Sequence, residues 1–213
     1  MKFMENIFSK IKQQLLQSLD SDIILSSSFV DKHNSKSYTL VKNFKKAAVL
    51  CLLDYNDQDL TIILTLRSKK LKDHPGQISF PGGKVNNKEN LFDCALRETN
   101  EEIGLKSKNI NVLGELNMYL SGSNFLIKPI VGYTDGRFRV SLNKDEVDRV
   151  IYFPISYLFN NRNLTKSSYI DKSSNTKKFY YDIYWHDMRI WGTTAIILVH
   201  LSKIINSVIL KDV

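Results

Sequence analysis

The segment from residue 83 to 105, which reads GKVNNKENLFDCALRETNEEIGL, constrains the fold more than any other part of the chain. An α-helix advances about 100° per residue, so Glu98, Glu101 and Glu102 share an arc of about 100° on one face of such a helix. The apolar stripe that would pack on a core consists of Phe92, Leu96, Thr99 and Ile103. The spacing therefore predicts a helix over about residues 89–103 that is acidic on one face and buried on another.

The acidic face has two interpretations. Three carboxylates within little more than one turn repel one another unless a cation lies between them, and sites made of oxygen ligands suit Mg²⁺ or Mn²⁺. The alternative is an ordinary solvated face of a surface helix. The preceding turn, Phe80-Pro81-Gly82-Gly83, favours the metal site, because paired glycines allow the backbone to approach a ligand closely. Gly104 provides a plausible stop for the helix.

The same segment matches the Nudix box, GX5EX7REUXEEXGU, in which U is a bulky and usually aliphatic residue, except that Thr99 fills the first U position. The matching positions are Gly83, Glu89, Arg97, Glu98, Glu101, Glu102, Gly104 and Leu105. The chain therefore resembles the Nudix hydrolase superfamily. This resemblance implies an αβα sandwich with a mixed sheet and a metal-dependent hydrolase of diphosphate bonds.

Residues 63–83, ILTLRSKKLKDHPGQISFPGG, resemble the second motif, LLTXR(S/A)X3RX3GX3FPGG, of the coenzyme A pyrophosphatase branch. Lys72 replaces the arginine of that motif, and Ile63 replaces its first leucine. Lysine binds phosphate as a point charge and lacks the planar fork of arginine. The resemblance implies that coenzyme A or acyl-CoA is cleaved to 3′,5′-ADP and 4′-phosphopantetheine or its acylated form, with Mg²⁺ or Mn²⁺ as cofactor.

We assign Glu98 and Glu102 as the principal metal ligands, because they lie one turn apart on the same face. Glu101 is a further ligand or the base that activates water. Arg97 is expected to brace these carboxylates through charge-assisted pairs. Glu89 braces the loop or binds metal.

Glu146, in a later loop, is a second candidate for the catalytic base. Arg67, Ser68 and Lys72 lie just before the glycine turn, where a phosphate-rich end of the substrate would be held. The complete set of predicted substrate-binding residues is Arg67, Ser68, Lys72, Gln77, Gly82 and Gly83. His74 would lie in the same loop, where a solvent-facing role is an equal alternative.

The composition of the chain limits its expected partners and its expected location in the cell. The chain has 213 residues, 43% of them hydrophobic, and a net charge of +8 that fits either a lysine-rich surface or attraction for phosphate. Its lysines are spread along the chain, so we expect no nucleic-acid partner. Cys51 and Cys94 form neither a disulfide framework nor a zinc pattern, which together with the lack of a secretory signal favours a cytoplasmic protein. No segment reaches the roughly 18 apolar residues that a membrane span requires.

The remaining periodicity predicts an N-terminal amphipathic helix over residues 3–19, a polar connector over 20–46 with a short strand near 37–41, and a closing helix at about 193–209. We interpret the asparagine- and serine-rich stretch 160–177 as a mobile insertion. Strand-like segments are expected at 46–55, 61–67, 111–120, 125–133 and 150–158, and a hairpin at 178–191. The predicted fold is α/β, with residues 1–46 as helix and connector and 47–213 as the hydrolase domain.

Alternative functions remain open. The Nudix box alone permits hydrolysis of ADP-ribose, NADH, dinucleoside polyphosphates or nucleoside triphosphates. A non-catalytic nucleotide- or RNA-binding module of the same fold is the alternative from another class, although the complete glutamate set argues against loss of chemistry. No GxSxG elbow and no GxxxxGK[ST] loop are present. The expected partner is a small nucleoside diphosphate derivative similar to coenzyme A, and a homodimer is left open.

Overall fold

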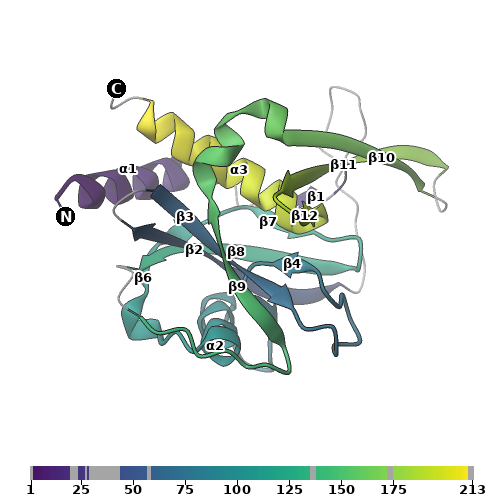
Figure 1. The fold of residues 1–213 in the computed structure, drawn as a ribbon, viewed down its shortest axis with the longest axis horizontal. Coiled ribbons are helices and arrows are strands. Elements are labelled where there is room, and N and C mark those ends of the chain that lie inside the picture. Colours follow the sequence, from purple (N-terminus) through teal and green to yellow (C-terminus); the bar gives the residue numbers. More distant parts are fainter. Residues whose placement is uncertain are drawn as a thin grey trace.

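The computed structural model describes residues 2–19, 24–26, 28, 44–56, 59–134, 138–171 and 175–210. Within these residues the fold is a mixed β-sheet between helices, with a second, smaller sheet at one end (Figure 1). The predicted short strand near 37–41 and residues 57–58 of the turn after the first strand lie outside the described residues. The predicted mixed α/β class is confirmed.

Nine of the described strands form one sheet, in the order β1-β7-β8-β2-β3-β4, with β5 paired to β2, β6 to β8 and β9 to β3. Two pairs are parallel, β1 with β7 and β2 with β8, and the others are antiparallel. The bounds are β1 (Ile24–Ser26), β2 (Lys45–Asn56), β3 (Asp59–Arg67), β4 (Ile78–Ser79), β5 (Gly82–Lys84), β6 (Asn111–Glu115), β7 (Met118–Leu120), β8 (Phe125–Thr134) and β9 (Val147–Pro154).

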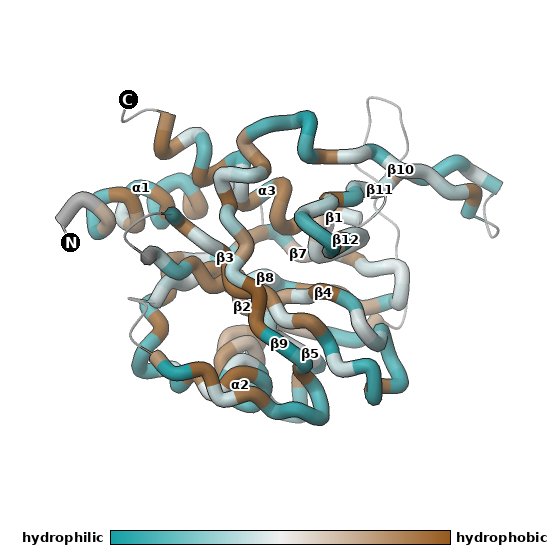
Figure 2. Tube along the Cα trace, in the orientation of Figure 1, coloured by the Kyte–Doolittle hydropathy of each residue, from teal (hydrophilic) through white to brown (hydrophobic). Residues whose placement is uncertain are grey.

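The central strand β2 separates two hydrophobic cores. Cys51 and Leu53 face the core on one side of the sheet, whereas Leu50 and Leu52 face the core on the other, because side chains alternate along a strand. All four are fully buried, and residues 47–53 of β2 form a continuous apolar run (Figure 2). A strand covered on both faces needs helices on both sides, which gives the αβα sandwich.

Three α-helices are described: α1 (Lys2–Ser18), α2 (Leu91–Ile103) and α3 (Gly192–Ile209). Helix α2 packs on one face of the sheet, against β2 and β5, while α1 and α3 contact each other on the opposite side (Figure 1). Short 3-10 helices lie at Ser107–Asn109, Ile155–Phe159 and Asn161–Asn163.

The N-terminal helix α1 belongs to the same core as the sheet. Ile7, Phe8, Ile11 and Leu15 are buried, and the ring of Phe8 stacks on Tyr133 of β8 at 4.0 Å. This confirms the predicted apolar stripe and shows that α1 uses it to pack on the body of the protein. The outer face of the helix is polar apart from Leu16, which is 66% exposed.

Helix α3 is the one described helix that is long and apolar enough, by length and composition, to cross a membrane, and 50% of its apolar window is buried inside the protein. Ala195, Leu198, Leu201 and Ile205 are fully buried in the core that α3 shares with α1. The observed burial is that of a packed core helix, as the polar interruptions in its sequence predicted.

The second sheet contains β10 (Leu164–Asp171), β11 (Thr176–Trp185) and β12 (Met188–Trp191), all antiparallel. The predicted hairpin over 178–191 is confirmed. The interpretation of residues 160–177 as a mobile insertion is wrong for most of that stretch, because β10 pairs with β11 along its whole length. Serine and lysine in β10 lie on a largely exposed strand, which explains why composition alone suggested a loop.

Candidate active site

Helix α2 carries most of the predicted site. It begins at Leu91, two residues later than predicted, because the side chain of Asn90 caps it by accepting the N–H of Asp93 at 2.8 Å. It ends at Gly104, which adopts a left-handed conformation with φ of 75° and donates its N–H to Asn100. The predicted helix stop is therefore confirmed.

The buried face of α2 differs from the predicted stripe. Thr99 and Ile103 are fully buried as expected, but Phe92 is 39% exposed. The small residues Cys94 and Ala95 are buried instead, because they let the helix approach the sheet closely; the Cys94 thiol lies 3.6 Å from the Gly83 carbonyl oxygen. This orientation turns part of the acidic face inward, toward the glycine turn.

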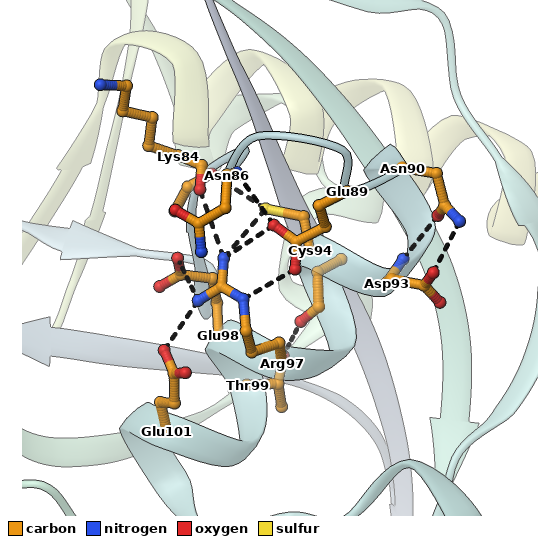
Figure 3. A network of polar contacts seen from close by, with 12 residues as sticks. Lys84, Asn86, Glu89, Asn90, Asp93, Cys94, Arg97, Glu98, Thr99 and Glu101 are labelled. Atoms are coloured by element: carbon orange, nitrogen blue, oxygen red, sulfur yellow. Dashed lines mark hydrogen bonds and ion pairs between the residues drawn. The ribbon is translucent and has the colours of Figure 1, made fainter.

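Arg97 lies at the centre of the carboxylates (Figure 3). Its Nε and Nη2 donate to both carboxylate oxygens of Glu89, at 2.7 and 3.0 Å. Its Nη1 lies 2.9 Å from Glu98 Oε1 and 2.8 Å from Glu101 Oε2. Nη2 also donates to the Lys84 carbonyl at 3.3 Å. One planar guanidinium thus fixes three of the four carboxylates of the motif, which is the geometry expected of a bracing arginine.

The braced carboxylates have different electrostatic environments. Hydrogen bonds from Arg97 and from the Asn86 N–H lower the pKa of Glu89 to about 2. Burial raises the pKa of Glu98 above its ordinary value, and the charges of Glu101 and Glu146 raise it further, although Arg97 opposes them. The ionised form of Glu89 is therefore stabilised by Arg97. Glu98 still experiences unfavourable electrostatic interactions, which a bound cation would relieve.

Glu102 is the most buried of the four glutamates of the motif. It is 2% exposed, and its Oε2 is buried without a hydrogen-bond partner among the described residues. Burial, together with the charges of Glu98 and Glu146, raises its pKa to about 8, against the opposing effects of Arg67 and the Gly82 N–H. A buried oxygen left unpaired costs roughly 1–3 kcal/mol. A buried carboxylate oxygen without a partner, on a residue that also feels the charges of two other carboxylates, is the feature that most strongly indicates a cation site.

Two residues from distant parts of the chain join this cluster. Glu146 precedes β9, and its charge acts on Glu98 and Glu102; its Oε1 accepts a hydrogen bond from Asn143 at 3.2 Å. Arg67 ends β3, and its charge acts on Glu102. The Ser68 N–H donates to the Glu146 carbonyl at 2.8 Å, which ties the two loops together. Both residues were predicted from the sequence as candidates, but only the fold shows that they act on the same carboxylates.

The glycine turn faces the carboxylates across a short gap. Gly83 pairs with Ala48 of β2, and a Cβ built at Gly83 would lie 2.5 Å from the Glu98 carboxyl carbon. No side chain fits there without displacing Glu98. The turn therefore brings its backbone close to Glu98, whereas the approach of that backbone to a ligand stays a prediction.

Gly83→Ala is expected to leave the fold intact and to lower kcat by roughly 10-fold to 100-fold, since small displacements of catalytic groups carry penalties of this size. The clash is with the end of a flexible side chain, so Glu98 moves while the sheet does not. Steady-state kinetics and thermal unfolding measured together check this. Unchanged kinetics would show that the close approach of Gly83 to Glu98 has no catalytic consequence.

The end of β3 and the loop from β3 to β4 contain four of the six predicted substrate-binding residues, while Gly82 and Gly83 lie in β5. Ser68 is 1% exposed, and its hydroxyl accepts the Lys70 N–H at 3.3 Å, so it shapes the loop from within. Lys72 and His74 are exposed, and Gln77 is half-buried with its backbone hydrogen-bonded to Arg67 and His74. Arg67 donates to the Asp73 carbonyl at 3.3 Å, while its buried Nε has no partner among the described residues. The substrate-binding roles of these residues remain predictions.

The donor chemistry of the cluster suits a hard divalent cation. Glu98, Glu102 and Glu146 supply only oxygen, they perturb one another, and one oxygen of Glu102 is orphaned. In the described part of the chain, no three His, Cys, Asp or Glu side chains already stand in a geometry that would hold a metal ion together. The residues therefore fit a cation by type, charge and burial. Burial raises the pKa of the Cys94 thiol to about 11, so the thiol is protonated at neutral pH.

The chain is similar in sequence and in fold to known proteins. The family model described as "NUDIX domain" matches residues 44–170. NudL of Photorhabdus laumondii, described as an uncharacterised Nudix hydrolase, is 32% identical over 166 residues, covering 77% of this chain and 87% of that protein. Nudix hydrolase 3 of Caenorhabditis elegans is 30% identical over 215 residues, covering 94% and 87%. A solved MutT/nudix family protein from Enterococcus faecalis, 18% identical, aligns with a TM-score of 0.47 over 80% of this chain and 65% of that chain.

Proposed function

The chain belongs to the family of NUDIX-domain hydrolases and is a diphosphatase, and from this premise we propose that its substrate is coenzyme A or an acyl-CoA. The products would be 3′,5′-ADP and 4′-phosphopantetheine or its acylated form. Members of the family generally need divalent metal ions; for this chain we propose Mg²⁺ or Mn²⁺.

The observation that carries the proposal is the position of residues 63–83. This segment, which resembles the second motif of the coenzyme A pyrophosphatases, ends in the Gly82-Gly83 turn against Glu98 and Glu102. The positive charge of Arg67, which belongs to this segment, lowers the pKa of Glu102 against the larger effect of burial. The segment that resembles the motif of one substrate class thus ends beside the carboxylates of the hydrolase motif, which supports the proposal.

Each residue of the site has a distinct proposed role. Glu98 and Glu102 would hold the cation, and the charge of Glu146 acts on both of them. A bound divalent cation neutralises the diphosphate and lowers the pKa of a water molecule that it binds. Arg97 keeps Glu98 and Glu101 in place and, being fully engaged with carboxylates, is a positioning residue. Arg67 lies where it would offset the negative charge of the substrate.

Glu101 and Glu146 remain the two candidates for the base. Glu101 is half-exposed, and one of its oxygens is held by Arg97. Glu146 is half-buried, receives one hydrogen bond from Asn143, and its charge raises the pKa of both Glu98 and Glu102. A base must accept a proton from water, which a carboxylate paired with arginine does less readily. This comparison favours Glu146 over Glu101.

Substrate profiling tests the proposal. Purified protein with Mg²⁺ or Mn²⁺ is incubated separately with coenzyme A, ADP-ribose, NADH, diadenosine polyphosphates and dNTPs, and products are identified by chromatography and mass spectrometry. We expect coenzyme A to give 3′,5′-ADP and 4′-phosphopantetheine, with turnover abolished by EDTA. If coenzyme A stays intact while another compound is hydrolysed, the diphosphatase assignment stands and the coenzyme A proposal fails.

A further inference from the structure

Residues 141–147 form a loop that is bonded to the end of helix α2. The last carbonyl groups of a helix have no partner within the helix, so they need donors from elsewhere. Here the Ser141 N–H donates to the Ile103 carbonyl at 2.9 Å, and the Asn143 N–H donates to the Glu102 carbonyl at 3.0 Å. We call residues 141–147 the capping loop. Its backbone is fixed directly to the backbone of a proposed metal ligand.

The glycine that ends α2 makes room for the capping loop. A Cβ built at Gly104 would lie 2.7 Å from the Cβ of Ser141 and 3.1 Å from the Ser141 carbonyl oxygen. Real side chains do not approach one another this closely, so a larger residue at this position would push the loop away from the helix. The placement of the capping loop therefore depends on Gly104 as well as on the two hydrogen bonds.

Asn143 organises the capping loop with both its backbone and its side chain. Its carbonyl oxygen accepts the N–H groups of Glu146 at 3.0 Å and Val147 at 2.8 Å. Its Oδ1 accepts the Asp145 N–H at 3.2 Å, which is the pattern of an Asx turn. Since a backbone N–H requires an acceptor, this contact fixes which end of the amide is oxygen. The NH₂ end is left to donate to Glu146 Oε1, at 3.2 Å.

The backbone of Glu146 is held from the opposite side by β3 and the loop that follows it. The Glu146 carbonyl accepts the Ser68 N–H at 2.8 Å. The pairing of β3 with β9 shifts its register at Arg67, which is paired with Val147, so a β-bulge lies next to Glu146. Bulges beside active sites commonly re-aim a side chain. With the backbone fixed on both sides, the orientation of the Glu146 carboxylate depends on its own torsions, which the Asn143 amide restricts.

Resting on the proposed function, in which Glu146 is the favoured base, we propose that Asn143 is a positioning residue for the Glu146 carboxylate. Its side chain orients that carboxylate, while its N–H ties the same loop to Glu102. Because the amide binds Oε1, Oε2 is the oxygen available to a water molecule. An amide is neutral, so it orients the carboxylate without the full positive charge that Arg97 places against Glu101. A base must lie within hydrogen-bond reach of the proton that it accepts, and Asn143 provides this placement.

Asn143→Ser tests the proposal, because the backbone hydrogen bonds of residue 143 do not depend on its side chain. Serine keeps an oxygen that can accept the Asp145 N–H, but it is too short to reach Glu146. We expect kcat for the best diphosphate of the substrate profile to fall by roughly 10-fold to 100-fold, the effect of a misplaced catalytic group. KM should stay within about two-fold, since the lost interaction acts on the transition state.

Two measurements without substrate accompany the kinetics. The affinity for Mn²⁺, followed by electron paramagnetic resonance, should remain within about two-fold of the wild type, because the proposed ligands Glu98 and Glu102 keep their contacts. The melting temperature should change little, since the turn and the backbone bonds of the capping loop are retained. If the affinity for Mn²⁺ falls together with kcat, the amide acts on the cation site and the inference is overturned.

A double-mutant cycle shows whether Asn143 acts through Glu146. In the Glu146→Gln background, Asn143→Ser should reduce kcat little further, because the effects of coupled positions do not add. A general structural role would instead reduce kcat by the same factor in both backgrounds, which would contradict the proposal. Wild-type turnover in Glu146→Gln alone would show that Glu146 is not the base, and the positioning role would fail with it.

Asp145→Ala is the matched control within the capping loop. The side chain of Asp145 is 85% exposed and pairs with Lys70 at 3.2 Å. Exposed ion pairs contribute little, so we expect kcat to remain within about two-fold of the wild type. A loss as large as that of Asn143→Ser would show that any change in this loop lowers turnover, and it would overturn the inference. So would an Asn143→Ser variant with wild-type kcat.

The outcome for Asn143 is separate from the identity of the substrate, because the comparison uses whichever diphosphate is hydrolysed. If coenzyme A stays intact in the substrate profile, the coenzyme A proposal fails while the cycle still decides the role of Asn143. If coenzyme A is cleaved and Asn143→Ser has no effect, the proposed function stands and the positioning role fails.

Discussion

Glu102→Gln is expected to lower kcat by roughly 10²-fold to 10³-fold and, in metal-free protein, to raise the melting temperature. The loss follows because a bound metal contributes several kcal/mol of charge stabilisation in the transition state and Glu102 is one of its two principal proposed ligands. The gain follows because Glu102 is buried, has an orphaned oxygen and lies near the charges of Glu98 and Glu146. Glutamine keeps the size of the side chain but removes its charge.

The stability gain should be on the order of 1–3 kcal/mol at neutral pH in the presence of EDTA, because the folded state raises the pKa of Glu102 from 4.5 to about 8 and glutamine removes that cost. Adding Mg²⁺ or Mn²⁺ should stabilise the wild type, because a ligand that binds only the folded state shifts the unfolding equilibrium. The same addition should stabilise Glu102→Gln much less. Thermal unfolding with and without metal, next to steady-state kinetics, measures all three effects.

Glu101→Gln is the matched control, since it removes a carboxylate from the same helix that is half-exposed and already paired with Arg97. It should not raise the melting temperature, because it breaks an ion pair instead of relieving a buried charge. A Glu102→Gln variant that is no more stable without metal, or that keeps wild-type turnover, would show that Glu102 is a structural carboxylate and not a ligand.

The behaviour of Glu102 also marks the limit of what spacing could predict. A helical wheel places Glu98, Glu101 and Glu102 on one arc, and that prediction holds. It cannot say that Glu102 is buried and Glu101 half-exposed, because the tilt of α2 is set by Cys94 and Ala95 packing against β2 and β5. The packing of the two small residues Cys94 and Ala95 sets the orientation of α2. The buried stripe that was predicted to include Phe92 was therefore centred on the wrong part of the helix.

Long-range convergence was the other part that the sequence left open. The two strands before the helix, the hairpin at the C-terminal end and both terminal helices follow from local periodicity, and the structure confirms them. The proximity of Glu146 to the carboxylates depends on β9 pairing with β3, a contact between segments far apart in the chain.

Arg97→Lys is expected to reduce kcat by about 10-fold to 100-fold, which is the usual effect of removing a group that orients metal ligands. The positive charge remains, but one ammonium cannot hold both oxygens of Glu89 while also contacting Glu98 and Glu101. The unfolding free energy should fall by roughly 1–3 kcal/mol because hydrogen bonds to partly buried carboxylates are lost.

The pKa of Glu89 distinguishes a positioning role from a purely structural one. Arg97 and the Asn86 N–H hold this pKa at about 2 in the wild type. In Arg97→Lys it should move toward the ordinary value of 4.5, as followed by carboxyl NMR shifts. If Glu89 shifts and stability falls while kcat is unchanged, Arg97 braces the loop without setting the geometry of Glu98. If kcat falls and the combined variant Glu89→Gln with Arg97→Lys loses no more than Arg97→Lys alone, the two residues act as one brace, because the effects of coupled positions do not add.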